Sequence, residues 1–134
     1  MREIKFIGKD LKDQSWHIGD LEYNPAAKVA RIHSYDEHGF YSGNSRVDPD
    51  TVGQFTGLYD AKCREIYEGD IFRVGDHTIR VVYEIDRENG FALRIWKSPT
   101  LNRNSWRLPL EKSFVTDYEI VGNIYDEQEQ INAN

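Results

Sequence analysis

TIRVVYEIDRENGFALRIW, residues 78–96, is the stretch of sequence that decides the fold. In its first half, apolar side chains recur at every second position, which is typical of a strand that buries one face: Ile79, Val81, Tyr83 and Ile85. Asn89-Gly90 then favours a tight hairpin turn, because both residue types tolerate a positive φ. The stretch therefore predicts two antiparallel strands, 78–86 and 91–96, closed by a turn at 88–90.

The β pattern continues on both sides of this hairpin. Alternation predicts further strands at 3–8, 14–23, 28–35, 70–74 and 118–125. Residues 36–50 are rich in Asp, Gly, Ser and Asn and are predicted to be a loop or linker. Residues 98–112 lie around two prolines and are predicted to be irregular.

We therefore predict a mainly β protein, since several short strands with glycine-rich turns are typical of a small barrel or sandwich. The expected organisation is a small β-rich N-terminal lobe at residues 1–50, an SH3-like β-barrel at 51–125 and a polar tail at 126–134. The same alternation predicts these core residues: Ile71, Val74, Val81, Tyr83, Phe91, Leu93, Ile120 and Ile124.

Composition excludes several classes of protein. Three Trp, eight Tyr and six Phe in 134 residues argue against a disordered chain. A net charge of −6, from 17 Lys and Arg against 23 Asp and Glu, argues against a surface that attracts nucleic acid as a whole. Cys63 is the single cysteine, so we expect no internal disulfide and a reducing cytoplasm. No apolar run approaches a signal peptide or membrane span, so we expect neither export nor insertion.

Residues 65–71, EIYEGDI, predict a tight corner that leads into a new strand. Gly69 can take a positive φ there, and the Asp70 carboxylate can accept backbone N–H groups of the turn. Glu68 is expected to be solvated. Charged side chains beside Tyr67 could also form a polar contact surface, which makes Tyr67, Glu68 and Asp70 candidate binding residues.

This corner and three other runs resemble the YopX family of small phage and prophage proteins. The runs are residues 56–60 (TGLYD), residues 2–6 (REIKF) and residues 118–125 (YEIVGNIY). The chain departs from the family pattern at Lys62-Cys63, where an Asn-Gly turn is usual, and after residue 125. The resemblance implies a phage-type protein in the cytoplasm of a host bacterial cell, and it brings no catalytic residue with it.

Residues suited to catalysis or metal binding are few. His33-Ser34-Tyr35-Asp36-Glu37-His38 could in principle hold a divalent metal, but the run also fits a polar strand end. Cys63 lies between Lys62 and Arg64, whose charges favour a thiolate, or it is simply a turn residue. A Gly-x-Ser-x-Gly motif and a glycine-rich phosphate loop are both absent from the sequence. We predict no enzyme activity, no metal and no cofactor.

Basic residues gather in residues 94–112, where five Lys and Arg face Glu111 alone. Aromatic rings beside guanidinium groups could stack on single-stranded bases, which gives these candidate binding residues: Trp96, Arg103, Trp106 and Arg107. The alternative is that the loop neutralises acidic neighbours within the chain, such as Glu84, Asp86 and Glu88.

Two functions of different classes follow from the sequence. The first is a non-enzymatic interaction module that binds protein and self-associates. The alternative is a nucleic-acid-associated β-barrel module that uses the basic loop around Trp106.

Overall fold

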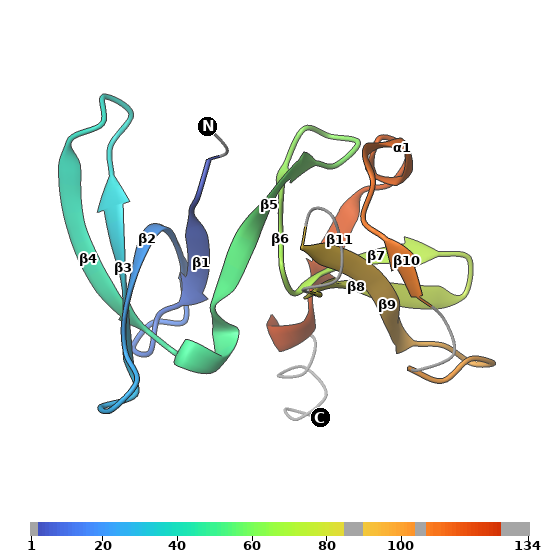
Figure 1. Cartoon of the computed structure of the whole chain (residues 1–134), viewed down its shortest axis with the longest axis horizontal. Helices are drawn as coiled ribbons and strands as arrows, with labels where there is room; N and C mark the ends of the chain where they lie inside the picture. Colours follow the sequence, from blue (N-terminus) through green and yellow to red (C-terminus); the bar gives the residue numbers. More distant parts are fainter. Residues whose placement is uncertain (1–2, 85–89, 104–106, 127–134) are drawn as a thin grey trace. The chain divides into compact units, whose positions relative to one another are not determined.

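The structure, a computed structural model, describes residues 3–84, 90–103 and 107–126. It is mainly β, which confirms the predicted class, and its strands form two antiparallel sheets (Figure 1). The chain divides into two compact units, Met1–Phe55 and Thr56–Asn134. The predicted polar tail lies, apart from Asp126, outside the described residues.

The elements follow one another along the chain in this order: β1 (Phe6–Lys9), β2 (Trp16–Asn24), β3 (Val29–Tyr35), β4 (Tyr41–Val47), η1 (Pro49–Thr51), β5 (Gly53–Tyr59), β6 (Glu65–Tyr67), β7 (Asp70–Val74), β8 (His77–Tyr83), β9 (Phe91–Lys97), β10 (Arg107–Pro109), α1 (Lys112–Val115) and β11 (Ile120–Asn123). Among the helices of the described residues, none has the length and apolar character needed to cross a membrane.

In the N-terminal unit, consecutive antiparallel strands lie in the order β4-β3-β2-β1, and the first residues of β5 pair with β1. Its core is small and centres on Ala30, Ile32 and Val47. The prediction of a loop at 36–50 is wrong, because β4 lies within it. Ser, Gly and Asn have low β propensity, but pairing with β3 and burial of Val47 outweigh that preference.

In the C-terminal unit, five strands lie in the order β10-β9-β8-β7-β11. The hairpin predicted from residues 78–96 is confirmed, since β8 pairs with β9 from Thr78 opposite Lys97 to Tyr83 opposite Phe91. The Glu84 N–H continues this ladder by donating to the carbonyl oxygen of Gly90 over 2.7 Å. Asn89 lies outside the described residues.

The core of this unit fills one face of the five-stranded sheet and contains most of the predicted core residues. Val81, Phe91 and Leu93 are buried in this cluster, and Val74 and Ile120 are partly buried against it. Ile71 and Ile124 are buried outside the cluster, and Ile71 lies on the other face of the sheet, opposite Arg80 on β8. The prediction for Tyr83 is wrong, because its side chain is 54% exposed. Tyr83 ends β8, so its ring covers only the edge of the core, with its centroid 6.0 Å from that of Phe91.

The segment predicted to be irregular, 98–112, contains β10 and the first residue of α1. Across the described part of the chain, no strand pairing closes the five-stranded sheet into a barrel. The established architecture is therefore two antiparallel sheets.

Candidate functional site

The carboxylate of Asp60 ties the turn at residues 60–64 to the start of β11. Oδ1 accepts the backbone N–H groups of Lys62 and Arg64 at 3.0 and 2.8 Å. Oδ2 accepts the N–H of Ile120 at 2.9 Å and the guanidinium of Arg64 at 3.0 Å from Nε. Burial by itself would raise the pKa of Asp60, but these hydrogen bonds outweigh it and hold the pKa below its usual range. The buried carboxylate is therefore ionised.

Further contacts bind the same turn to residues 118–120. Nη2 of Arg64 donates to the carbonyl oxygen of Ile120 over 2.7 Å. The N–H of Ala61 donates to the carbonyl oxygen of Tyr118 over 2.9 Å. Two sequence runs about sixty residues apart, TGLYD at 56–60 and YEIVGNIY at 118–125, are thus parts of one hydrogen-bonded structure, which we term the Asp60 clasp.

Cys63 occupies the third position after Asp60 in this turn, with φ of +63°. Its N–H donates to the Asp60 carbonyl oxygen over 2.9 Å, and its side chain is exposed. A positive φ is unusual for a residue with a β-carbon, which explains why an Asn-Gly pair suits this turn. The geometry favours the turn-residue interpretation of Cys63 over a nucleophile.

The corner at Glu68-Gly69-Asp70 is built as the sequence predicts. Gly69 has φ of +96°, which confirms its expected positive φ. Its N–H donates to the carbonyl oxygen of Val81, and its own carbonyl accepts the N–H of Ile124, both over 2.9 Å. A β-carbon on Gly69 would lie 2.9 Å from Cε2 of Tyr125. The corner therefore fixes the end of β11 against β8.

Asp70 accepts the N–H of Tyr67 at Oδ2 over 2.8 Å, as predicted for a turn-capping carboxylate. Burial raises the pKa of Asp70 to about 7, and the hydrogen bond from Tyr67 and the charge of Arg64 only partly oppose that rise. Tyr67 is 3% exposed, and its hydroxyl donates to Glu65 over 3.2 Å. Of the three candidate binding residues at this corner, Tyr67 is thus enclosed and Glu68 is half-buried.

Residues 7–132 match the family model described as YopX protein. The chain belongs to the YopX family. No match is found among curated proteins. Three of the runs that carry the YopX resemblance, residues 56–60, 65–71 and 118–125, take part in the Asp60 clasp and the Gly69 corner, so the structure gives them a role in holding β11 to the rest of the C-terminal unit.

The face of this YopX sheet opposite its core carries a row of basic side chains. Arg107 on β10 lies opposite Arg94 on β9, which lies opposite Arg80 on β8. We term these three residues the arginine row. Like charges directly opposite one another on neighbouring strands are destabilising, so the row needs compensating negative charge.

Glu84 supplies part of that compensation. Its Oε2 lies 2.6 Å from Nε of Arg107, and its Oε1 lies 3.5 Å from Nη1 of Arg94. Burial lowers the pKa of Arg80, and the charges of Arg103 and Arg94 lower it further. Among the described residues, Nε of Arg80 is buried without a hydrogen-bond acceptor. These contacts fit the alternative prediction that the basic segment neutralises acidic neighbours such as Glu84. Sequence reasoning missed Arg80, although it alternates with the buried Ile79 and Val81.

The candidate residues of the basic loop are only partly brought together. The guanidinium of Arg103 lies 4.1 Å from the centre of the Trp96 ring, and that of Arg80 lies 5.4 Å from it. Nε of Arg103 also donates to the Trp96 carbonyl oxygen over 3.1 Å. Trp106 lies outside the described residues. Trp96 therefore acts as a support for two guanidinium groups.

Histidines and carboxylates of the N-terminal unit are engaged in local hydrogen bonds. The ring nitrogens of His33 lie 2.8 Å from Glu22 and 3.0 Å from the hydroxyl of Tyr41. Asp10, Asp13 and His17 form a compact group that could hold a cation. However, Asp10 accepts the N–H of Lys12 and bonds His17, and Asp13 accepts from Ser15, as in an ordinary polar turn.

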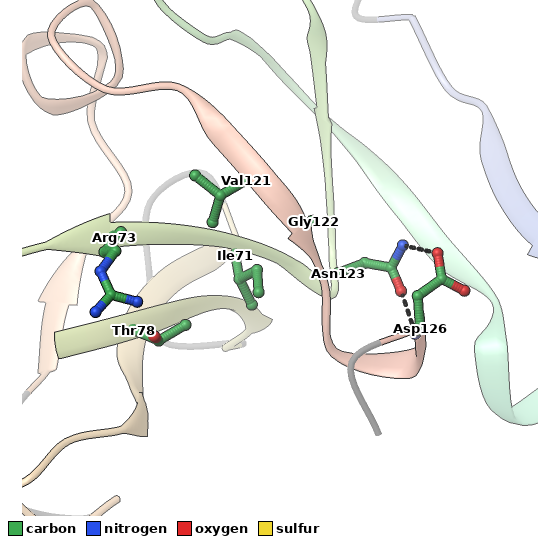
Figure 2. A pocket seen from close by; sticks show the side chains of 7 residues that line it. All are labelled: Ile71, Arg73, Thr78, Val121, Gly122, Asn123 and Asp126. Atoms are coloured by element: carbon green, nitrogen blue, oxygen red, sulfur yellow. Dashed lines mark hydrogen bonds between the residues drawn. The ribbon is translucent and has the colours of Figure 1, made fainter. Parts of the chain in front are cut away.

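A shallow pocket of about 350 Å³ lies at the other end of the C-terminal sheet (Figure 2). Arg73 and Thr78 lie toward one end of it, and Asn123 and Asp126 lie toward the other. Asn123 donates to the Asp126 carboxylate and accepts the Asp126 N–H, each over 2.9 Å. Asn123 and Asp126 thus satisfy one another, as in an Asx turn that follows β11.

The Gly69 corner generates a stability prediction. Gly69→Val combines backbone strain with a close approach to Tyr125 and should lower the free energy of unfolding by about 2–4 kcal/mol. Gly75→Val is the matched control, because Gly75 has φ of +60° but open space around its β-carbon. Strain alone should cost the control about 1–2 kcal/mol. Urea denaturation measures both, and equal losses would show that Tyr125 does not constrain the corner.

The raised pKa of Asp70 generates a pH prediction. In the folded protein the Asp70 carboxyl has a pKa of about 7, whereas in the unfolded chain its pKa is near 3.8, so between these values only the folded state holds the proton. Protonated Asp70 therefore contributes its full share to the free energy of unfolding below about pH 4. That contribution is lost as pH rises through 7, at a rate of at most about 1.4 kcal/mol per pH unit. Asp70→Asn keeps an acceptor for Tyr67 and should gain stability over the wild type across this range in urea denaturation. The exposed Asp76→Asn is the control, and a constant difference between Asp70→Asn and wild type from pH 4 to 8 would contradict the prediction.

Proposed function

We propose that this YopX-family protein is a non-enzymatic interaction module of phage or prophage type, which binds protein and self-associates in the cytoplasm of a host bacterial cell. The family runs support a non-enzymatic role, because their polar side chains bind backbone groups of turns. Buried, satisfied carboxylates of this kind stabilise a scaffold and are not positioned to act on a substrate.

We infer further that the C-terminal unit is an SH3-like barrel. Its strands β7, β8, β9 and β10 form a consecutive antiparallel meander. After the single turn of α1, β11 returns to pair with β7. This strand order is that of SH3-like barrels, which supports the finer assignment.

The observation that carries the proposed self-association is a group of exposed aromatic side chains in the N-terminal unit. Tyr35, Phe40 and Tyr41 are 50%, 70% and 55% exposed, and we term them the β3–β4 aromatic patch. The rings of Tyr35 and Tyr41 meet edge to face, with centroids 5.8 Å apart. Exposed aromatic clusters are typical of protein interfaces, because each ring buries a large area at little entropic cost.

The patch lies beside a sheet edge that could receive another strand. β4 is the end strand of its sheet. The carbonyl of Arg46 points away from β3 and accepts the N–H of Leu11 over 3.3 Å, so the end of this edge at residues 46–48 is occupied by the chain itself. Asn44, two residues earlier, faces the same way in a regular strand. A second copy could pair with the part of the edge before Arg46 while covering the aromatic patch, as in a two-fold symmetric dimer.

Phe40→Asp tests this function. Sedimentation equilibrium over a range of concentrations should show reversible association of the wild type. The dissociation constant of the variant should be about tenfold larger or more. Ile4→Asp changes a residue of the same unit that is 61% exposed and should leave the association unchanged. A monomeric wild type at all concentrations would remove the proposal, as would equal association of both variants.

A second candidate function is association with nucleic acid, and the arginine row favours it. A sheet face that presents several guanidinium groups can neutralise backbone phosphates without reading a base sequence. We propose that nucleic acid would contact the sheet face, with the basic loop beside it. The rest of the molecule is acidic, so such binding would be confined to this face.

Arg80→Gln tests the second candidate. If the row neutralises phosphates, the logarithm of the binding constant should fall linearly with the logarithm of salt concentration. The variant should reduce that slope by about 0.7–0.9, the value of one phosphate contact. Arg31→Gln removes an arginine of the N-terminal unit and should leave the slope unchanged. No mobility shift with single- or double-stranded DNA or RNA at low salt would exclude this function.

A further inference from the structure

We propose that Glu84 regulates the basic face: in the free protein its carboxylate occupies Arg94 and Arg107, and a nucleic-acid phosphate displaces it on binding. The inference rests on the second candidate function, association with nucleic acid, and adds an internal competitor to it. A carboxylate and a phosphate are equivalent ligands for guanidinium groups, since both offer two coplanar oxygen acceptors to its N–H donors.

The position of Glu84 supports this role. It directly follows β8, and its N–H still bonds to Gly90 in the ladder, so its side chain falls on the same face as Arg80. Its two oxygens contact two different arginines, Arg107 at 2.6 Å and Arg94 at 3.5 Å. The carboxylate is 14% exposed, whereas the side chain of Arg107 is 44% exposed. An incoming anion can therefore approach Arg107 from solvent.

The charge balance of the face leaves room for a further anion. Glu84 contacts two members of the arginine row, and the charges of Arg94 and Arg103 repel Arg80. The charge of Glu68 attracts Arg80, and yet the Nε of Arg80 has no acceptor among the described residues. A buried donor without an acceptor is costly, and a phosphate oxygen would satisfy it.

The spacing of the row suits a polymer of phosphates. Neighbouring strands lie about 4.8 Å apart, so Arg80 and Arg107, separated by β9, lie about 10 Å apart across the sheet. A nucleic-acid backbone that crosses the strands could therefore meet all three arginines with successive phosphates. A single small anion could satisfy one or two of them.

Glu84→Gln tests the inference, because it removes the competing charge and keeps the shape. The probes are a fluorescein-labelled thymidine oligonucleotide of about 20 nucleotides, which exceeds the site of a small β-barrel domain, and a duplex of the same length. Fluorescence anisotropy at constant low salt should show binding about threefold to tenfold tighter than that of the wild type. Glu111→Gln removes the same charge from an exposed carboxylate that makes no capping hydrogen bond, and its affinity should stay within about twofold of the wild type.

A double-mutant cycle separates competition from a general change in charge. In an Arg107→Gln background, Glu84 has already lost its contact with Arg107. The increase in oligonucleotide affinity that Glu84→Gln causes should therefore be smaller than in the wild-type background. Glu84→Asp offers a second variant if Glu84→Gln does not fold. It keeps the charge but shortens the reach to both arginines, and it should also tighten binding.

Three outcomes would overturn the inference. If the wild type binds and Glu84→Gln binds no tighter than Glu111→Gln, Glu84 is a structural brace and nucleic-acid association stands without it. If the gain persists undiminished in the Arg107→Gln background, Glu84 acts through overall charge. If no variant binds either probe at low salt, both the regulation and the second candidate function fail, while the proposed self-association is unaffected.

Discussion

The C-terminal unit depends on one buried, ionised carboxylate, that of Asp60. It accepts three backbone N–H groups and the guanidinium of Arg64, and it joins the turn at 60–64 to the start of β11. Without it, the N–H of Ile120 and the N–H groups of the turn would lose their acceptor, and any of them that water does not reach would carry a desolvation cost. Because β11 pairs with β7, the clasp also decides whether the last strand of the sheet is in place.

Asp70 shows what happens to a carboxylate with fewer partners in the same unit. It accepts the N–H of Tyr67, and burial raises its pKa, whereas the larger set of donors around Asp60 lowers the pKa of that group. At Asp70 burial dominates and the charge of Asp60 adds to the rise, whereas at Asp60 the hydrogen bonds from Ile120, Arg64 and Lys62 together outweigh burial. Two polar side chains of the family runs, Asp60 and Asp70, thus accept backbone N–H groups that the fold needs to satisfy. Binding surfaces are better sought on the sheet face and on the β3–β4 aromatic patch.

These two surfaces differ in the interactions that they offer. The aromatic patch presents apolar area and a sheet edge, which suit another protein surface. The arginine row presents positive charge within a molecule of net negative charge, so it attracts anions locally and only at short range in salt. Glu84 connects the row to its own chain, and its two contacts limit how much positive charge the free protein presents.

The sequence by itself determined what depends on neighbours along the chain. Alternation at Ile79 and Val81 and the Asn-Gly turn predicted the β8–β9 hairpin, and the glycine of EGD predicted the positive φ of Gly69. Tertiary structure decided the rest. β4 forms from a polar segment because β3 provides its partner, and Tyr83 is exposed because the core ends beside it. The arginine row, the Glu84 contacts and the link from Asp60 to Ile120 depend on strand register across the sheet and on contacts sixty residues apart. A periodic pattern shows which face of a strand is buried, but it does not show which residue of another strand lies opposite.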